Sequence, residues 1–149
     1  MTRRLCIAVV IMMLMAAGNS FAGNIDAACP STVHYGTGTT TLNVTVTFTN
    51  YDCSPVTYQR YMAGLITNSD ATLGGAGIYG PFPKNLTTPI IVPAATCSTT
   101  HLPGIVTKII PVTNAVPNVT GKMGAVFVEF LTAKGKSMGD GQCMVSIVP

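Results

Sequence analysis

The chain contains no tryptophan and few charged residues, and both features limit what it can do. Charged side chains make up 9% of the 149 residues, against about 25% in an average soluble domain. A nucleic-acid-binding surface needs Lys and Arg gathered on one face. Beyond the first 22 residues, the closest basic pair is Lys134 and Lys136. We therefore predict that the protein does not bind nucleic acid.

Groups that could carry catalysis or hold a metal are equally scarce. The two histidines, His34 and His101, lie in no recognisable catalytic or metal-binding motif, and nucleophilic hydrolysis needs a His base beside its nucleophile. Glu129 is the one acid within an apolar segment, whereas glycoside hydrolysis needs two facing carboxylates. We predict no catalytic residue, no metal site and no cofactor. His34 and His101 are expected to have structural or surface roles, Glu129 to face solvent, and Met123 and Met144 to pack in a core.

The N-terminus has the layout of a secretory signal. Arg3 and Arg4 precede an uninterrupted apolar run at 5–17, and residues 20–22 place small side chains where a signal peptidase cleaves. A run of 13 residues is too short to cross a bilayer core, which needs about 20. We predict that residues 1–22 are removed and that no integral membrane segment remains. A single domain, residues 23–149, would then work outside the cytoplasm, in the periplasm or at the cell surface.

The predicted mature chain is nearly neutral and rich in threonine. Without Arg3 and Arg4, six basic residues remain against five acidic ones, a net charge of +1. Thr-rich, charge-poor segments suit β-strands. They also leave the edges of a sheet poorly protected against pairing with another chain, because charge is the usual protection.

The cysteines indicate two disulfides. Cys6 leaves with the signal, and the four that remain, Cys29, Cys53, Cys97 and Cys143, are widely spaced, unlike the close pairs of a zinc or redox site. Four cysteines allow three connectivities. We favour Cys29–Cys53, which would clamp the ends of an N-terminal hairpin, together with Cys97–Cys143, which would tie the last strand to the middle of the chain.

Apolar and polar residues alternate along most of the mature sequence, as in half-buried β-strands. The clearest case is 41–49, and the segments 56–66, rich in β-branched and aromatic residues, and 104–110 are predicted as further strands. Gly64 interrupts the second of these segments, and we predict a β-bulge there.

The remaining segments predict a hairpin and two weaker strands. Residues 124–133 and 141–148 are predicted to pair as a hairpin across a Gly-rich and Lys-rich turn, 134–140. Segments 78–82 and 86–92 are bounded by prolines, which restricts them to edge strands or extended loops.

About seven short strands separated by turns predict an antiparallel β-sandwich. Its architecture is expected to be immunoglobulin-like or fibronectin-like. The tryptophan that packs beside the disulfide of an immunoglobulin domain is missing, so the likeness concerns architecture alone.

Three functions remain open. The first is an exported, non-catalytic interaction or structural module with a protein or cell-surface partner, which could be a second copy of itself. The second is the subunit of an extracellular fibre that assembles by strand addition, with the C-terminal strand at 142–148. The third is a small secreted carbohydrate-binding protein or enzyme, with Tyr79 and Phe82 as its ligand-facing aromatics.

Overall fold

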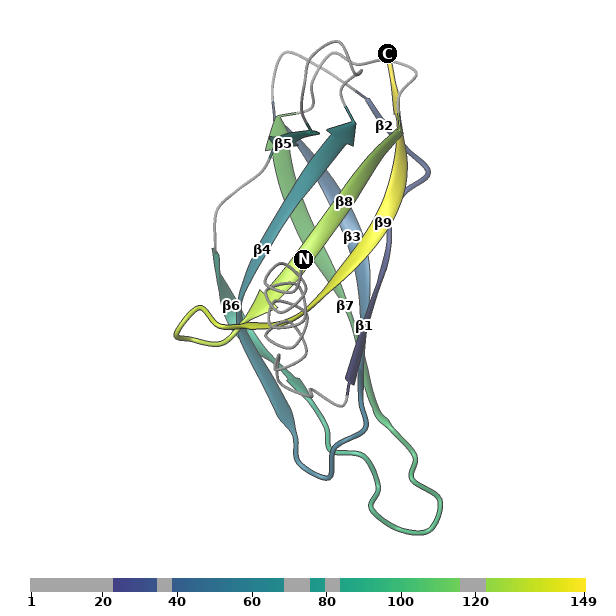
Figure 1. Cartoon of the computed structure of the whole chain (residues 1–149), viewed down its shortest axis with the longest axis vertical. Helices are drawn as coiled ribbons and strands as arrows, with labels where there is room; N and C mark the ends of the chain where they lie inside the picture. The colour runs from purple at the N-terminus through teal and green to yellow at the C-terminus, as the bar shows by residue number, and fades with distance from the viewer. Residues whose placement is uncertain (1–22, 35–38, 69–75, 80–83, 116–122) are drawn as a thin grey trace, which may run out of the picture.

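The computed structural model describes residues 23–34, 39–68, 76–79, 84–115 and 123–149, and the predicted signal at 1–22 lies outside this part of the chain. The described residues form strands and no helix (Figure 1). They therefore contain no helix of the length and apolar character needed to cross a membrane. The strands are β1 Gly23–Ala28, β2 Thr32–His34, β3 Thr39–Asn50, β4 Val56–Asn68, β5 Ala76–Tyr79, β6 Lys84–Val92, β7 Gly104–Ala115, β8 Met123–Leu131 and β9 Ser137–Val148.

The strands form two sheets that pack face to face, which confirms the predicted β-sandwich. One sheet has the order β1-β3-β7 and is antiparallel throughout. The other has the order β2-β9-β8-β4-β5, with β6 also paired to β4. The strands exceed the predicted number partly because the N-terminal segment divides. β1 joins the first sheet and β2 runs parallel to β9 in the second, since Pro30 between them lacks the N–H needed to continue a ladder.

The core lies between the sheets and follows the alternation of the sequence. In β3, Leu42, Val44, Val46 and Phe48 are buried while the threonines between them face outward. Phe48 meets Tyr58 and Phe130 of the opposite sheet at ring-centroid distances of 5.0 and 4.7 Å. This aromatic cluster occupies the centre of the sandwich in a chain that has no tryptophan.

Two expectations about the strands are wrong. Gly64 pairs regularly with Phe127, and the irregularity of β4 lies between Tyr58 and Arg60 instead. Met123 and Met144 are 50% and 57% exposed rather than packed in the core. The alternation explains the methionines, because the buried neighbours of each lie at the positions of opposite parity in β8 and β9. Glu129 shares the outward parity of Met123, as predicted.

All four cysteines of residues 23–149 are paired, as predicted, but the favoured connectivity is wrong. Cys29 pairs with Cys143 and Cys53 with Cys97, each with a Cα–Cα distance of 5.6 Å. The register of β1 on β3 explains the error. Ala28 lies opposite Thr45, whereas Cys53 follows the other end of β3 at Asn50. Those ends are about 17 Å apart along the strand, well beyond the roughly 7 Å that a disulfide spans.

One side of the sandwich is tightly closed. Cys29 follows β1 and its disulfide reaches β9 of the opposite sheet. A Cβ on Gly141 would lie 3.0 Å from the Cβ of Ala27, so the two strands approach as closely as a glycine permits. The other side, where β6 and β7 are the edges of the two sheets, contains the site described next.

Candidate functional site

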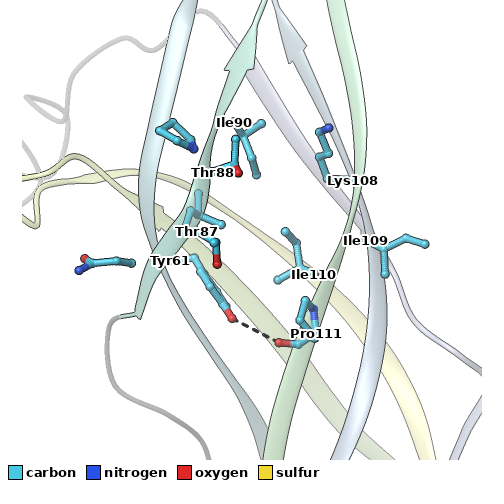
Figure 2. Close-up of a pocket in the computed structure, with 11 residues that line it drawn as sticks. Tyr61, Thr87, Thr88, Ile90, Lys108, Ile109, Ile110 and Pro111 are labelled. Carbon is cyan, nitrogen blue, oxygen red and sulfur yellow. Dashed lines mark hydrogen bonds between the residues drawn. The ribbon is translucent and has the colours of Figure 1, made fainter.

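A groove with a volume of about 340 Å³ lies between β6 and β7 (Figure 2). It is bounded by 85–90 on β6, by 108–111 on β7 and by Tyr61 of β4. Its described lining is mostly apolar or hydroxyl-bearing, and Lys108 is the one charged side chain in it.

The groove exists because β6 leaves the β4 ladder. Ile90 lies opposite Tyr58 and Asn85 opposite Arg60, so the four residues 86–89 of β6 face a single residue of β4. Pro89 falls within this stretch and cannot donate a ladder hydrogen bond. The strand therefore bulges, and its displaced residues line one bank of the groove.

Tyr61 forms the floor of the groove and joins the two sheets. Its side chain is 8% exposed, and its hydroxyl donates a hydrogen bond to the carbonyl oxygen of Pro111 on β7 at 3.3 Å (Figure 2). Burial raises the pKa of Tyr61 above that of an exposed tyrosine. The hydroxyl thus keeps its proton at neutral pH and acts as a hydrogen-bond donor, not as a proton-transfer group.

The outer edge of β7 presents unpaired backbone groups. In the described sheet β7 pairs with β3 alone. Pro111 has no N–H, and its carbonyl bonds Tyr61, so the backbone of this residue faces away from β3. Backbone direction alternates along a strand, so the N–H and C=O groups of Ile105, Thr107 and Ile109 also face the open side.

Lys108 lies on the core-facing parity of β7, between the half-buried Val106 and the buried Ile110, yet it is exposed. An inward-pointing charge on an edge strand is a device that limits uncontrolled edge pairing. Here it also places a cation beside an otherwise uncharged groove. The sequence signal for this site was an edge-type strand, 104–110, with Lys108 on its apolar face and Pro111 just beyond it.

The histidines and Glu129 form no common site. His34 is exposed at the end of β2, where its Nδ1 hydrogen bonds the backbone oxygen of Pro149, and His101 is exposed in the β6–β7 loop. Those two segments lie at opposite ends of the sandwich (Figure 1). In the part of the chain that is described, no group of three or more His, Cys, Asp or Glu could hold a metal ion.

The predicted ligand-facing aromatics cannot be placed together. Phe82 lies outside the described residues, and Tyr79 is described as the last residue of β5 by its backbone only.

A catalytic motif that sequence reasoning overlooked also proves structural. Residues 135–139 match G-x-S-x-G, the pattern of a nucleophile elbow. An elbow joins a strand to a helix, whereas Gly135 lies in the turn between β8 and β9 and Ser137 begins β9. Gly135 has a φ of 79°, which serves the reversal of this hairpin.

Comparison with known proteins finds a distant likeness in fold. No family model matches the chain, and no curated protein matches it in sequence. Its fold is similar to part of Pseudomonas fluorescens alkylpurine DNA glycosylase AlkC bound to DNA containing an abasic site analog, with 14% identity and a TM-score of 0.42. The match covers 90% of this chain and 33% of the glycosylase chain. A likeness with this TM-score does not indicate a function for the protein.

Proposed function

We propose that this protein is an extracytoplasmic, non-catalytic interaction module that binds an extended polypeptide on the open side of its sandwich. The observation that carries the proposal is the groove between β6 and β7, bordered by the unpaired edge of β7. An added strand would hydrogen bond to the backbone of β7, and every second side chain would enter the groove.

Strand order supports an immunoglobulin-like architecture for the module. In immunoglobulin domains the first, second, fifth and fourth strands form one sheet against the third, sixth and seventh. The order β1-β3-β7 against β4-β8-β9 corresponds to this arrangement without its fourth strand, once β2, β5 and β6 are taken as additional strands. Neither disulfide occupies the position of the inter-sheet bridge of an immunoglobulin domain. The proposed likeness therefore concerns strand order and not the disulfides.

The two disulfides are compatible with an oxidising, extracytoplasmic compartment. Together with the N-terminal signal inferred from sequence, they support a periplasmic or cell-surface location.

The groove favours a particular class of peptide. Lys108 would attract a carboxylate, and the Tyr61 floor with its apolar surroundings would accept a small apolar side chain. The β7 edge below Pro111 offers backbone groups of three residues, which a segment of about five residues would cover.

The test is selection of peptides from a random library with the mature chain as bait, followed by calorimetry on two variants. Thr88→Trp fills the groove, whereas Gln142→Trp adds the same side chain to an exposed position of β9 that does not line the groove. Selected peptides should be extended, apolar and mildly acidic. Thr88→Trp should weaken their binding at least about tenfold while Gln142→Trp leaves it unchanged. An equal loss of peptide affinity in both variants, or an affinity that Thr88→Trp leaves unchanged, would overturn the proposal.

A further inference from the structure

The exposed edge of β7 is self-complementary. Ile105, Thr107 and Ile109 share the parity whose side chains face outward and whose backbone groups face the open side. Read in either direction, these positions give Ile, Thr, Ile. Both isoleucines are unusually exposed for their type, at 56% and 65%. No charged residue occurs at these three positions, and the one charge within this segment, Lys108, lies on the opposite face of the strand.

We propose that a second copy of this chain occupies the edge, with β7 pairing antiparallel to β7 of that copy about a two-fold axis at Thr107. This inference rests on the proposed function, because it names the occupant of the same open side. The two three-stranded sheets would become one six-stranded sheet, and an isologous contact of this kind closes as a dimer.

The residues of β7 favour the register centred on Thr107 over those centred on Lys108 and Ile109. Centring the axis on Lys108 would place the two lysines directly opposite each other, which is destabilising. Centring it on Ile109 would bring Pro111 into the ladder, where it cannot donate a hydrogen bond. With the axis on Thr107, Lys108 lies opposite the second copy's Val106, and Pro111 falls outside the paired segment.

The same register extends side-chain contacts that already exist within one chain. Thr107 Oγ1 lies 3.2 Å from Thr47 Oγ1 on the neighbouring strand. A hydroxyl can both donate and accept, so the pairing would create a row of four threonines across the two copies. On either side of this row, Ile105 of one copy would meet Ile109 of the other, which covers the exposed isoleucines of both.

Sedimentation of the mature chain, up to millimolar concentration, measures the association directly. The result expected is a concentration-dependent dimer. Ile109→Lys should weaken it at least about tenfold, because the substitution places two charges beside apolar partners. Thr45→Lys provides the matched control: Thr45 is exposed on the same face and pairs with Ile109, but it lies one strand inside the edge. The Thr45→Lys variant should still form the dimer.

Cysteine cross-linking then tests the register. Paired Cα atoms about 5.5 Å apart across the axis are within disulfide range, so Thr107→Cys should form covalent dimers. Ile109→Cys alone should not, because the two copies of that residue would be about 14 Å apart along the strands. A mixture of Ile105→Cys and Ile109→Cys chains should cross-link to each other.

Three results would overturn the inference: a monomer at every concentration, open-ended oligomers, or a dimer that Thr45→Lys abolishes while Ile109→Lys spares it. The last would indicate contact through the sheet face. A monomer that still bound selected peptides in the groove would remove the second copy as occupant and leave the proposed function standing.

Discussion

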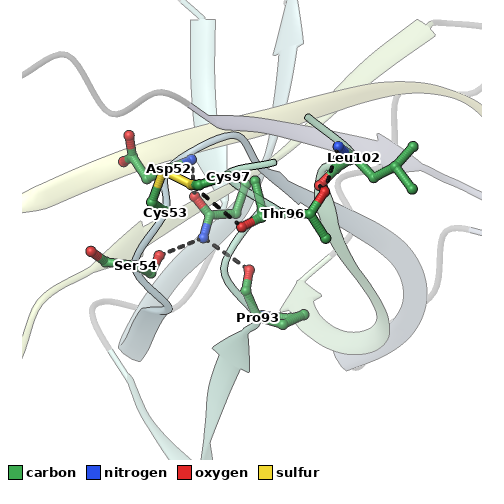
Figure 3. The surroundings of a disulfide bond; sticks show 9 residues. Asp52, Cys53, Ser54, Pro93, Thr96, Cys97 and Leu102 are labelled. Atoms are coloured by element: carbon green, nitrogen blue, oxygen red, sulfur yellow. Dashed lines mark hydrogen bonds between the residues drawn. A yellow bond between two sulfur atoms is a disulfide. The ribbon is translucent and has the colours of Figure 1, made fainter. Parts of the chain in front are cut away.

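Asn50 is the residue on which the lower end of the sandwich depends. Its side chain is fully buried at the end of β3, and every polar atom of its amide is hydrogen bonded, next to the Cys53–Cys97 disulfide whose surroundings Figure 3 shows. The amide nitrogen donates to the carbonyl oxygens of Ser54 and Pro93 at 2.8 and 2.9 Å, and the amide oxygen accepts from the N–H of Asp52 at 2.9 Å. One side chain therefore joins the β3–β4 turn to the segment that follows β6, beside the Cys53–Cys97 disulfide.

Asn50→Asp should destabilise the domain by about 2–3 kcal/mol or more. The substitution removes both donated hydrogen bonds and buries a carboxylate against two carbonyl oxygens. Urea unfolding measures the effect. Asn43→Asp, at an exposed position of the same strand, should change the free energy of unfolding by less than about 0.5 kcal/mol. Equal effects in the two variants would show that the buried contacts contribute nothing specific.

Tyr58 makes stability depend on pH in the alkaline range. Burial raises the pKa of its hydroxyl above the 10.0 of an exposed tyrosine. The unfolded chain therefore releases this proton first. Stability should be intact below pH 10 and fall as pH rises beyond it, by about 1.4 kcal/mol per pH unit while the folded state keeps the proton. Tyr58→Phe should flatten this dependence in urea unfolding measured between pH 8 and 11; an unchanged slope would contradict the assignment.

Among the elements, strands could be predicted wherever burial on one face imposes alternation. β3, β4, β7, β8 and β9 follow the sequence pattern because the core requires it. Features set by contacts between distant segments could not be predicted. The β6 bulge depends on what lies opposite Pro89, and the disulfide connectivity depends on which sheet the segments after β1 and β3 enter. The groove could not be predicted for the same reason, although Lys108 on the apolar face of its strand indicates one side of it.

Gly141 shows how a contact between distant segments limits the size of the side chain at one position of β9. Gly141→Val should destabilise the domain by about 1–3 kcal/mol, because its side chain would overlap Ala27 of β1, 3.0 Å from the Cβ position. The adjacent Gln142→Val adds the same side chain on the exposed face and should be nearly neutral. Thermal unfolding distinguishes the two. Equal melting temperatures of the two variants would contradict the close approach of β1 and β9.

At the scale of the molecule, the sandwich is fastened on one side and open on the other. The Cys29–Cys143 bridge joins segments 114 residues apart beside β1 and β9, and Cys53–Cys97 joins segments 44 apart at the end of the sandwich. Across the open side, a hydrogen bond from Tyr61 to Pro111 joins the two sheets. This asymmetry leaves β7 available to a partner without disturbing the fastened side.

The two disulfides should contribute unequally to stability. Loop-closure entropy predicts that replacing Cys29 and Cys143 by Ala costs about 1 kcal/mol more than replacing Cys53 and Cys97, because the longer loop restricts the unfolded chain more. Each loss should fall within about 2–5 kcal/mol. Urea unfolding of the two double variants measures the difference, and the reverse order would show that contacts in the folded state outweigh chain entropy.

Amide hydrogen exchange along β7 tests most directly the claim that its edge is the binding surface. Amides of 106, 108 and 110 should be protected at all times by β3, whereas those of Ile105, Thr107 and Ile109 should exchange rapidly in the dilute protein. These three should become protected when a selected peptide is added, or at high concentration if the partner is a second copy. Unchanged exchange at all three under both conditions would contradict the account.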